Sequence, residues 1–237
     1  RIRSRGLGDV YKRQNEVVVS YKWHDLPPGS GLLDLELGRE SELTHYDWIT
    51  DTTVHDGSAW AYMKNSKYKT TTDLVHYLID NVSKNGYMLL NIGPKPDGTI
   101  PEEDKNLLEG IGNWLDVNGE AIFETETWDQ YGEGPTKMNE AGPFSDNRAK
   151  LIYTAKDFRF TTKDNFLYAT ALGWPSKDFT IESIYKLFDN EIERVELLGS
   201  TDKVEWKHTR DGLHITRPDN KPCEHAYSFK ITRKEYL

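Results

Sequence analysis

Residues 70–119 constrain the fold of this chain most strongly, because two helical patterns there flank a short and almost continuous apolar run. Between residues 87 and 92 every side chain is apolar except that of Asn91. A run of this length, bounded by turn residues, is typical of a strand that is covered on both faces. We therefore expect a buried strand, with Asn91 at its C-terminal end, where α/β folds place their chemistry.

The two helical patterns have clear start and stop signals. The first helix should begin near Thr70 and end at Asn85-Gly86, and the second should begin at Pro101 and end at Asn118-Gly119. Their apolar stripes are Leu74, Val75, Leu78, Ile79 and Val82 in the first, and Leu107, Leu108, Ile111, Trp114 and Leu115 in the second. Helix, buried strand and helix indicate an α/β layer structure, and periodicity alone fits any domain of that class.

The composition excludes several kinds of partner. A net charge of −9 over 237 residues argues against nucleic acid, and no run approaches the roughly 18 apolar residues of a membrane span. Cys223 is the only cysteine, so no internal disulfide can form and cysteine usage does not indicate a compartment. His24, His45 and His55 lack metal-ligand spacing, so we predict neither a metal nor a cofactor.

Residues 1–14 differ from the rest of the chain. They are basic and glycine-spaced, without hydrophobic periodicity, a starting Met or the apolar region of a signal peptide. Residues 9–14 back-translate to the transposon mosaic end that is used in preparing sequencing libraries. We expect residues 1–14 to be a disordered, adaptor-derived tail joined to a reading frame that is truncated on its 5′ side, so that any signal peptide is missing.

Two carboxylates lie in the segment that follows the tail. Residues 16–20 form a β-branched run that predicts another buried strand, and Asp34 and Glu36 alternate in a second short run beyond a Pro/Gly loop. In an extended segment this spacing puts both carboxylates on one face. Two such acids are more often solvated surface residues than members of a catalytic site.

Beyond residue 128 the pattern changes from α/β to all-β. Residues 128–144 are rich in Gly and Pro and suggest a connector between domains. Eight short β-type runs follow, near residues 151–154, 158–162, 166–172, 179–184, 192–198, 204–208, 213–216 and 226–231. Runs of this length and spacing predict an antiparallel β-sandwich over residues 145–237, preceded by an α/β region over residues 15–127.

The sequence of the α/β block resembles that of a known family. The stretch VSKNGYMLLNIGPKPDGTIPEED, followed by LLEGIGNWLDVNGEAIFET, resembles the end of the catalytic barrel in the α-L-fucosidase family of glycoside hydrolases. ALGWP at residues 171–175 resembles a strand end in that family's sandwich. The resemblance implies the C-terminal portion of a (β/α)8-like barrel followed by an antiparallel β-sandwich. It also implies a retaining exo-α-L-fucosidase whose nucleophilic aspartate lies upstream, so that this chain alone should be inactive.

The same resemblance assigns site residues. It makes Glu36 the general acid/base and places Lys22 and Trp23 among the substrate contacts, with Lys22 where the family usually has Arg. Trp60 matches an aromatic residue that packs against the fucose ring, and Trp48 is as well explained by the core as by substrate contact.

Two further positions depart from the family pattern. Ile49 stands where the family often has Glu, and Asp51 stands where it often has Cys. Since Ile49 cannot transfer a proton, a role that depends on that glutamate is lost here, and we expect an altered specificity.

Two alternatives stay open. The chain could be a non-catalytic carbohydrate-binding or structural module, or part of a related glycosidase that acts on galactose-like sugars. The partner expected from the resemblance is a fucosylated glycan or oligosaccharide, with secretion or a periplasmic location implied by the family and a homo-oligomer left open.

Overall fold

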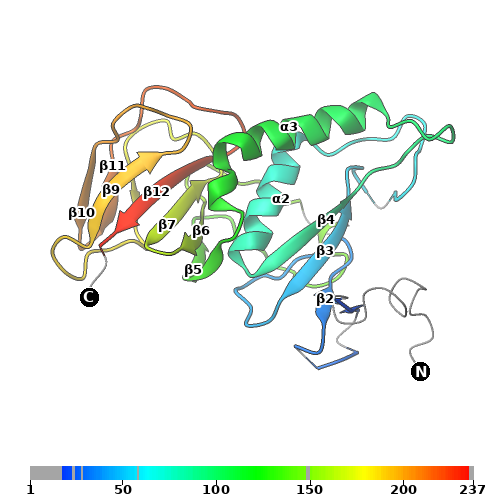
Figure 1. The fold of residues 1–237 in the computed structure, drawn as a ribbon, viewed down its shortest axis with the longest axis horizontal. Helices are drawn as coiled ribbons and strands as arrows, with labels where there is room; N and C mark the ends of the chain where they lie inside the picture. Colours follow the sequence, from blue (N-terminus) through cyan, green and yellow to red (C-terminus); the bar gives the residue numbers. More distant parts are fainter. Residues whose placement is uncertain (1–17, 23–24, 28, 58, 148–149, 235–237) are drawn as a thin grey trace.

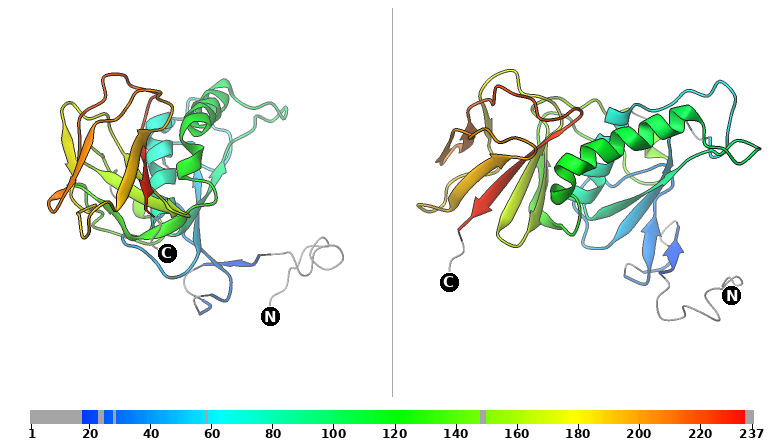
Figure 2. Two further views of the ribbon diagram at one scale, coloured as in Figure 1. Left: turned by 60° about the vertical axis from the view of Figure 1, so that its left-hand side comes forward. Right: turned by 45° about the horizontal axis from the view of Figure 1, so that its top comes forward.

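The computed structural model describes residues 18–22, 25–27, 29–57, 59–147 and 150–234, and Figure 1 shows their arrangement. The tail expected at residues 1–14 lies outside the described residues. Two β regions are separated by helices, with a small parallel sheet on one side and a larger antiparallel assembly on the other. The right-hand view of Figure 2 shows the same order from another direction.

The first β region is a four-stranded parallel sheet. Its strands are β1 (Ser20–Tyr21), β2 (Leu32–Asp34), β3 (Trp48–Thr53) and β4 (Gly86–Asn91), and they pair in that order. Helix α2 (Thr71–Ser83) connects β3 to β4, and α3 (Glu102–Asn118) follows β4. Parallel pairing, with a helix between β3 and β4 and another after β4, confirms the α/β prediction and agrees with part of a (β/α)8-like barrel.

The helix ends lie close to the predicted positions for local reasons. Thr70 caps α2, since its hydroxyl accepts from the backbone N–H of Asp73 while the Asp73 carboxylate accepts from the backbone N–H of Thr70. Asn85 adopts a left-handed conformation with φ of 72°, which turns the chain from α2 into β4. Helix α3 starts after Pro101 and leads into a short 3-10 turn, η1 (Gly119–Ala121).

The prediction that the run at residues 87–92 is covered on both faces is wrong. In β4, Tyr87 is 53% and Leu89 59% exposed, whereas Leu90 packs into the core formed with α2 and α3. Alternate side chains point to opposite faces of a strand, so only one face of β4 is covered by the described residues. In the described part of the run at residues 16–20, Val18 and Val19 are exposed and β1 (Ser20–Tyr21) has only two residues, so residues 18–20 are less buried than predicted.

The second β region is a sandwich of two antiparallel sheets. The larger sheet has the order β5-β6-β7-β12-β9 and the smaller has the order β10-β11-β8. Their strands are β5 (Glu126–Glu133), β6 (Phe158–Lys163), β7 (Phe166–Ala171), β8 (Phe179–Ile181), β9 (Ile192–Leu197), β10 (Trp206–Thr209), β11 (Gly212–Ile215) and β12 (Tyr227–Arg233). Apolar side chains from both sheets form one core, including Phe160, Phe229 and Leu213. This arrangement confirms the predicted sandwich.

Two details of this region differ from the sequence-based expectation. Residues 151–154 form no strand, and β5 lies partly in the segment that was expected to be a connector. Strand β5 pairs with β6 through an irregular register between Thr127 and Gly132. Such an irregularity interrupts the alternation by which a strand is recognised in a sequence.

Helix α2 packs against both β regions. It contacts β4 on one side and β5 and β6 on the other. The core around α2 and α3 also includes Leu172 and Ala226 from the sandwich, and the indole N–H of Trp114 donates to the carbonyl of Ala226 at 2.9 Å. The sandwich is therefore joined to the helices by a shared core. Among the described residues, no helix is both long and apolar enough to cross a membrane.

Candidate active site

Lys22, just after β1, lies among three carboxylates: Asp34 at the end of β2, Glu36 just beyond it, and Asp51 in the C-terminal half of β3. Its Nζ donates to Glu36 Oε2 at 2.7 Å and lies 3.5 Å from Asp34 Oδ2 and 3.7 Å from Asp51 Oδ2. The carboxylates are mostly buried, since the side chains of Asp34, Glu36 and Asp51 are 14%, 27% and 23% exposed. A single ammonium group thus faces three acids at the edge of the sheet where barrel folds bind substrates.

The pairing of β2 with β3 brings these acids together. Asp34 stands opposite Ile49, and beyond the strand the N–H of Leu37 donates to the carbonyl of Asp51 at 2.9 Å. This register sets Asp51 beside Glu36, one step further along the sheet than Asp34. The parallel register therefore builds the cluster from residues that lie far apart in the sequence.

Charge and burial shift two pKa values in the cluster. Burial, together with a hydrogen bond to Asp51 and the negative charge of Asp51, raises the pKa of Asp34 to about 6, and Lys22 only partly offsets this. For Lys22, burial acts against the charged form, but the hydrogen bond to Glu36 and the nearby carboxylates outweigh it and raise the pKa of Lys22. The pKa of Asp34 therefore lies closer to neutral pH than that of an ordinary aspartate.

A loop crosses the end of β4 and carries Trp60. The side-chain amide of Asn91 donates to the carbonyl of Trp60 at 2.9 Å, and Trp60 itself is half-buried. A side chain at Gly93 would come within 2.7 Å of the backbone nitrogen of Tyr62, so glycine lets this loop lie close to the strand. Asn91, which the sequence placed at a chemically favoured position, here anchors the Trp60 loop.

Trp48 and Trp23 are the other two aromatic residues that were proposed to contact the substrate. Trp48 is fully buried, its ring packs against Leu33 and Leu35, and its indole N–H donates to the carbonyl of Lys84 at 3.2 Å. With no exposed ring face it is a core residue, so the assignment of Trp48 as a substrate contact is corrected. Trp23 lies outside the described residues.

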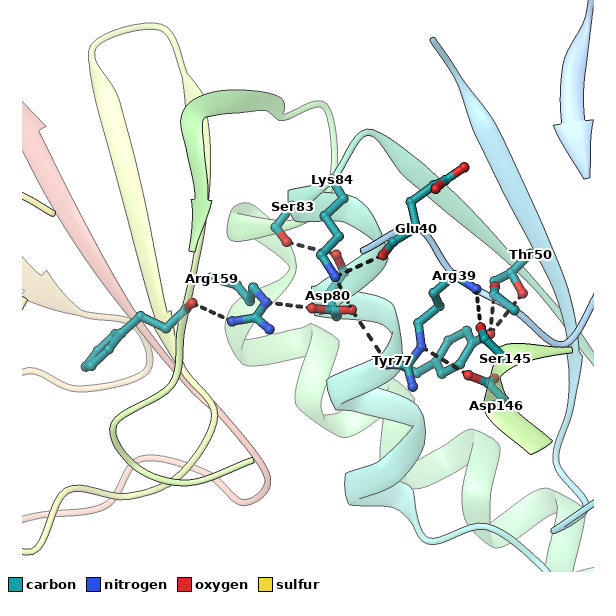
Figure 3. Close-up of polar contacts among 12 residues, drawn as sticks. Arg39, Glu40, Thr50, Tyr77, Asp80, Ser83, Lys84, Ser145, Asp146 and Arg159 are labelled. Carbon is teal, nitrogen blue, oxygen red and sulfur yellow. Dashed lines mark hydrogen bonds and ion pairs between the residues drawn. The ribbon is translucent and has the colours of Figure 1, made fainter. Parts of the chain in front are cut away.

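Asp80 of α2 is the centre of a second polar cluster (Figure 3). Its carboxylate is fully buried and accepts from Arg159 Nε at 2.6 Å and Lys84 Nζ at 2.9 Å, and Arg39 Nη1 lies 3.6 Å away. Arg39 also donates to Asp146 at 3.1 Å. The charges of Lys84, Arg159 and Arg39 overcome burial and hold the pKa of Asp80 well below its usual range. This cluster joins the helix to β6 and to the loop after β2.

The sequence analysis missed part of the cluster around Lys22. It noted Asp34 and Asp51 but gave them no role, because their proximity depends on the pairing of β2 with β3. The available signal was the acid at position 51 together with the alternation of Asp34 and Glu36. No group of three or more His, Cys, Asp or Glu side chains suited to a metal ion occurs within the described part of the chain.

Comparison with known protein families gives two matches in this chain. The model for "Alpha-L-fucosidase" matches residues 4–120, and the model for "Alpha-L-fucosidase C-terminal domain" matches residues 150–232. The first match thus begins inside the segment that was attributed to an adaptor, and it covers the parallel sheet with α2 and α3. The second covers the sandwich strands from β6 to β12, except for the last residue of β12, and leaves out β5.

Individual relatives agree with the family models. Plasma alpha-L-fucosidase of Pongo abelii is 29% identical over 235 residues, which are 96% of this chain and 43% of the relative. Plasma alpha-L-fucosidase of Rattus norvegicus is 31% identical over 80% of this chain and 39% of its own length. The chain therefore spans less than half the length of these relatives.

Solved fucosidase structures also match most of this chain over less than half of their own length. The crystal structure of Thermotoga maritima alpha-fucosidase in complex with fucose superimposes with a TM-score of 0.67 at 26% identity, covering 92% of this chain and 46% of the other. Another alpha-L-fucosidase structure reaches a TM-score of 0.73 at 25% identity, covering 94% of this chain and 47% of the other.

Proposed function

Because the chain belongs to the α-L-fucosidase family, we propose that it supplies the acid/base side of a retaining exo-α-L-fucosidase, with Glu36 as the general acid/base. The observation that carries this proposal is the position of Glu36. It follows a barrel-type strand, is mostly buried, and is held by Lys22 in a cluster of acids.

The proposed reaction uses Glu36 twice. As an acid it protonates the oxygen of the leaving group while a carboxylate nucleophile attacks the sugar, and as a base it then activates the water that releases fucose. These two carboxyl groups should lie about 5–5.5 Å apart. We assign the nucleophile to residues outside this sequence, and we expect the 237-residue chain alone to be inactive.

Lys22 orients Glu36 and can also release it. Its ammonium group has Asp34 and Asp51 within 4 Å as alternative partners. When a leaving-group oxygen approaches Glu36, Lys22 can move to these acids without losing a charged neighbour. Asp51 thereby provides a second charged contact for Lys22, in a chain whose lysine lacks the planar fork of an arginine.

The expected substrate is a terminal α-L-fucosyl group of a glycan or oligosaccharide. L-Fucose has a C–H-rich face and a methyl group, which pack well on an aromatic ring. Half-buried Trp60, whose carbonyl is bonded to Asn91 at the end of β4, is our candidate for such a ring.

Hydrolysis of an aryl α-L-fucoside by the protein encoded in the complete reading frame tests this function. Glu36→Ala should form the glycosyl-enzyme rapidly from an activated aryl fucoside but hydrolyse it slowly, and azide should restore turnover by replacing the water that needs a base. Glu42→Ala, at an exposed position six residues away, is the matched control and should behave as wild type.

Each outcome of this assay is decisive. If the wild type is active and Glu36→Ala is unaffected, the family function survives and the acid/base assignment fails. If the folded wild type hydrolyses no fucoside, the proposal fails in favour of a carbohydrate-binding module or a different sugar.

A further inference from the structure

We propose that residues 142–146, in the sandwich loop between β5 and β6, are a positioning element for Glu36 and act through its backbone and through Arg39. The inference rests on the proposed role of Glu36. It extends that role to a segment more than 100 positions away in the sequence, which no sequence motif connects with catalysis.

The first support is a continuous set of hydrogen bonds between residues 36–39 and residues 142–146. The carbonyls of residues 36, 37 and 39 each accept a backbone hydrogen bond from this segment, and the N–H of residue 39 donates to it. The bonds are Phe144 N to Glu36 O at 2.7 Å, Asp146 N to Leu37 O at 3.1 Å, Gly142 N to Arg39 O at 2.8 Å, and Arg39 N to Ser145 Oγ at 3.1 Å. Residues 142–146 are thus hydrogen-bonded to the backbone of Glu36 and to the backbone of Leu37 and Arg39, which follow it.

The second support is the close fit between the two segments. A methyl group at Gly38 would lie 2.1 Å from the carbonyl oxygen of Gly142, so only glycine allows the backbones to approach this closely. Leu37 has a left-handed φ of 49°, which an isolated leucine avoids. A strained conformation persists only where its surroundings hold it, and here the bonds from residues 142–146 do so.

The third support is the side chain of Arg39, which holds residues 36–39 against helix α2 and against Asp146 (Figure 3). Arg39 is 6% exposed, donates to Asp146 at 3.1 Å, and stacks over the ring of Tyr77 at 4.3 Å. The hydroxyl of Tyr77 in turn donates to the carbonyl of Gly38 at 3.2 Å. Helix α2 therefore supports residues 36–39, while Asp146 connects Arg39 to the loop between β5 and β6.

These contacts determine where Glu36 can lie. The strand β2 ends at Asp34, so beyond it Glu36 is positioned by bonds to β3 on one side and by residues 142–146 on the other. A displacement of about 1 Å in a catalytic group can cost about 100-fold in rate. If residues 142–146 loosen, Glu36 should move relative to the leaving group while the rest of the barrel strands stay paired.

Comparing substrates with different leaving groups distinguishes a displaced Glu36 from a general loss of stability. An acid/base residue matters most when the leaving group is a poorly acidic alcohol, and little when it is an activated phenol. A displaced Glu36 should therefore slow the alcohol substrate selectively, whereas partial unfolding lowers both rates by the same factor.

The test compares Asp146→Ala with Asp116→Ala, an exposed carboxylate on α3. In the 237-residue chain, amide hydrogen exchange at Phe144 and Gly142 should become at least about tenfold faster in Asp146→Ala, and exchange within α3 should not change. Unchanged exchange at both amides would overturn the proposed element.

The second arm uses the protein from the complete reading frame. For Asp146→Ala, kcat/KM should fall at least about tenfold more for a fucosyl alcohol than for an activated aryl fucoside, and Asp116→Ala should change neither. An equal fall for both substrates, or no fall, would refute positioning. If the wild type hydrolyses neither substrate, the proposed function fails and its catalytic extension with it, while the exchange data still report whether Asp146 secures the loop.

Discussion

Replacing Asp80 with alanine should lower the free energy of unfolding by about 3–5 kcal/mol, because it removes the shared acid of a buried ionic cluster. The three cations around Asp80 are not affected equally. Arg39 keeps Asp146, and Lys84 keeps the carbonyl of Glu40 at 3.1 Å.

The magnitude therefore comes mainly from Lys84 and Arg159, since Asp80 is the only acid that pairs with either of them among the described residues. The side chain of Arg159 is 5% exposed. After the substitution it keeps the carbonyl of Phe158 and the rings of Tyr131 and Tyr153, which are weaker partners than a carboxylate. Two buried cations are left without a counter-ion, so the expected cost is at least that of breaking one buried ion pair.

Urea unfolding at pH 7 measures this cost, and in thermal unfolding it corresponds to a lower midpoint by roughly 6–20 °C for a chain of this size. Asp189→Ala is the control, because Asp189 forms an exposed ion pair with Lys186, and its midpoint should match wild type. A loss below about 1 kcal/mol for Asp80→Ala would refute the view that the cluster is stabilising as a unit.

The pH dependence of the free energy of unfolding gives an independent check on the role of Asp80. The pKa of Asp80 is held below its usual value in the folded state, so its contribution is present above about pH 4 and is lost as the pH falls further. The stability difference between wild type and Asp80→Ala should thus be constant from pH 5 to pH 7, by the same linkage argument, and shrink at about pH 3. A difference that stays constant to pH 3 would contradict the low pKa.

Three further predictions concern single elements. Asp51→Asn should lower the pKa of Asp34 toward the ordinary aspartate value, as followed by carboxyl carbon-13 NMR, and an unchanged titration would show that the two acids are independent. Trp48→Ala should cost about 3–5 kcal/mol in urea unfolding, whereas Trp60→Ala should cost far less and instead raise KM for the fucoside; equal costs would contradict their different burial. Thr70→Ala should cost about 1 kcal/mol through loss of the α2 cap, and no change in urea would show that the cap is dispensable.

The parts of the fold that local interactions determine could be predicted from the sequence. The ends of α2 follow from Thr70 and from Asn85-Gly86, whose effects act within a few residues. The exposure of Tyr87 and Leu89 could not be predicted in this way, because an apolar run shows only that its residues suit a core. Which face of β4 is covered depends on what packs against the strand.

The site shows the same division between local and long-range information. Glu36 and Lys22 were proposed as site residues from the family resemblance of two short segments, and in the structure Lys22 Nζ lies 2.7 Å from Glu36 Oε2. Asp51 could not be joined to them, since its place beside Glu36 depends on the register of β2 against β3. Asp80 gave no signal at all, because its partner Arg159 lies 79 positions away and each alone looks like a surface charge on a helix or strand.

The ionic cluster has a consequence that an apolar contact between the same elements would lack. Apolar surfaces can slide past each other at little cost, whereas the bonds of Asp80 to Arg159 and Lys84 are directional and fix one position of α2 against β6. Arg39 belongs both to this cluster and to the loop that holds Glu36. The place of the sandwich relative to α2 is therefore connected, through Asp80 and Arg39, to the place of Glu36. It follows that Asp80→Ala should also accelerate amide exchange at Phe144, and an effect on stability without any effect at that amide would show that the two clusters are mechanically separate.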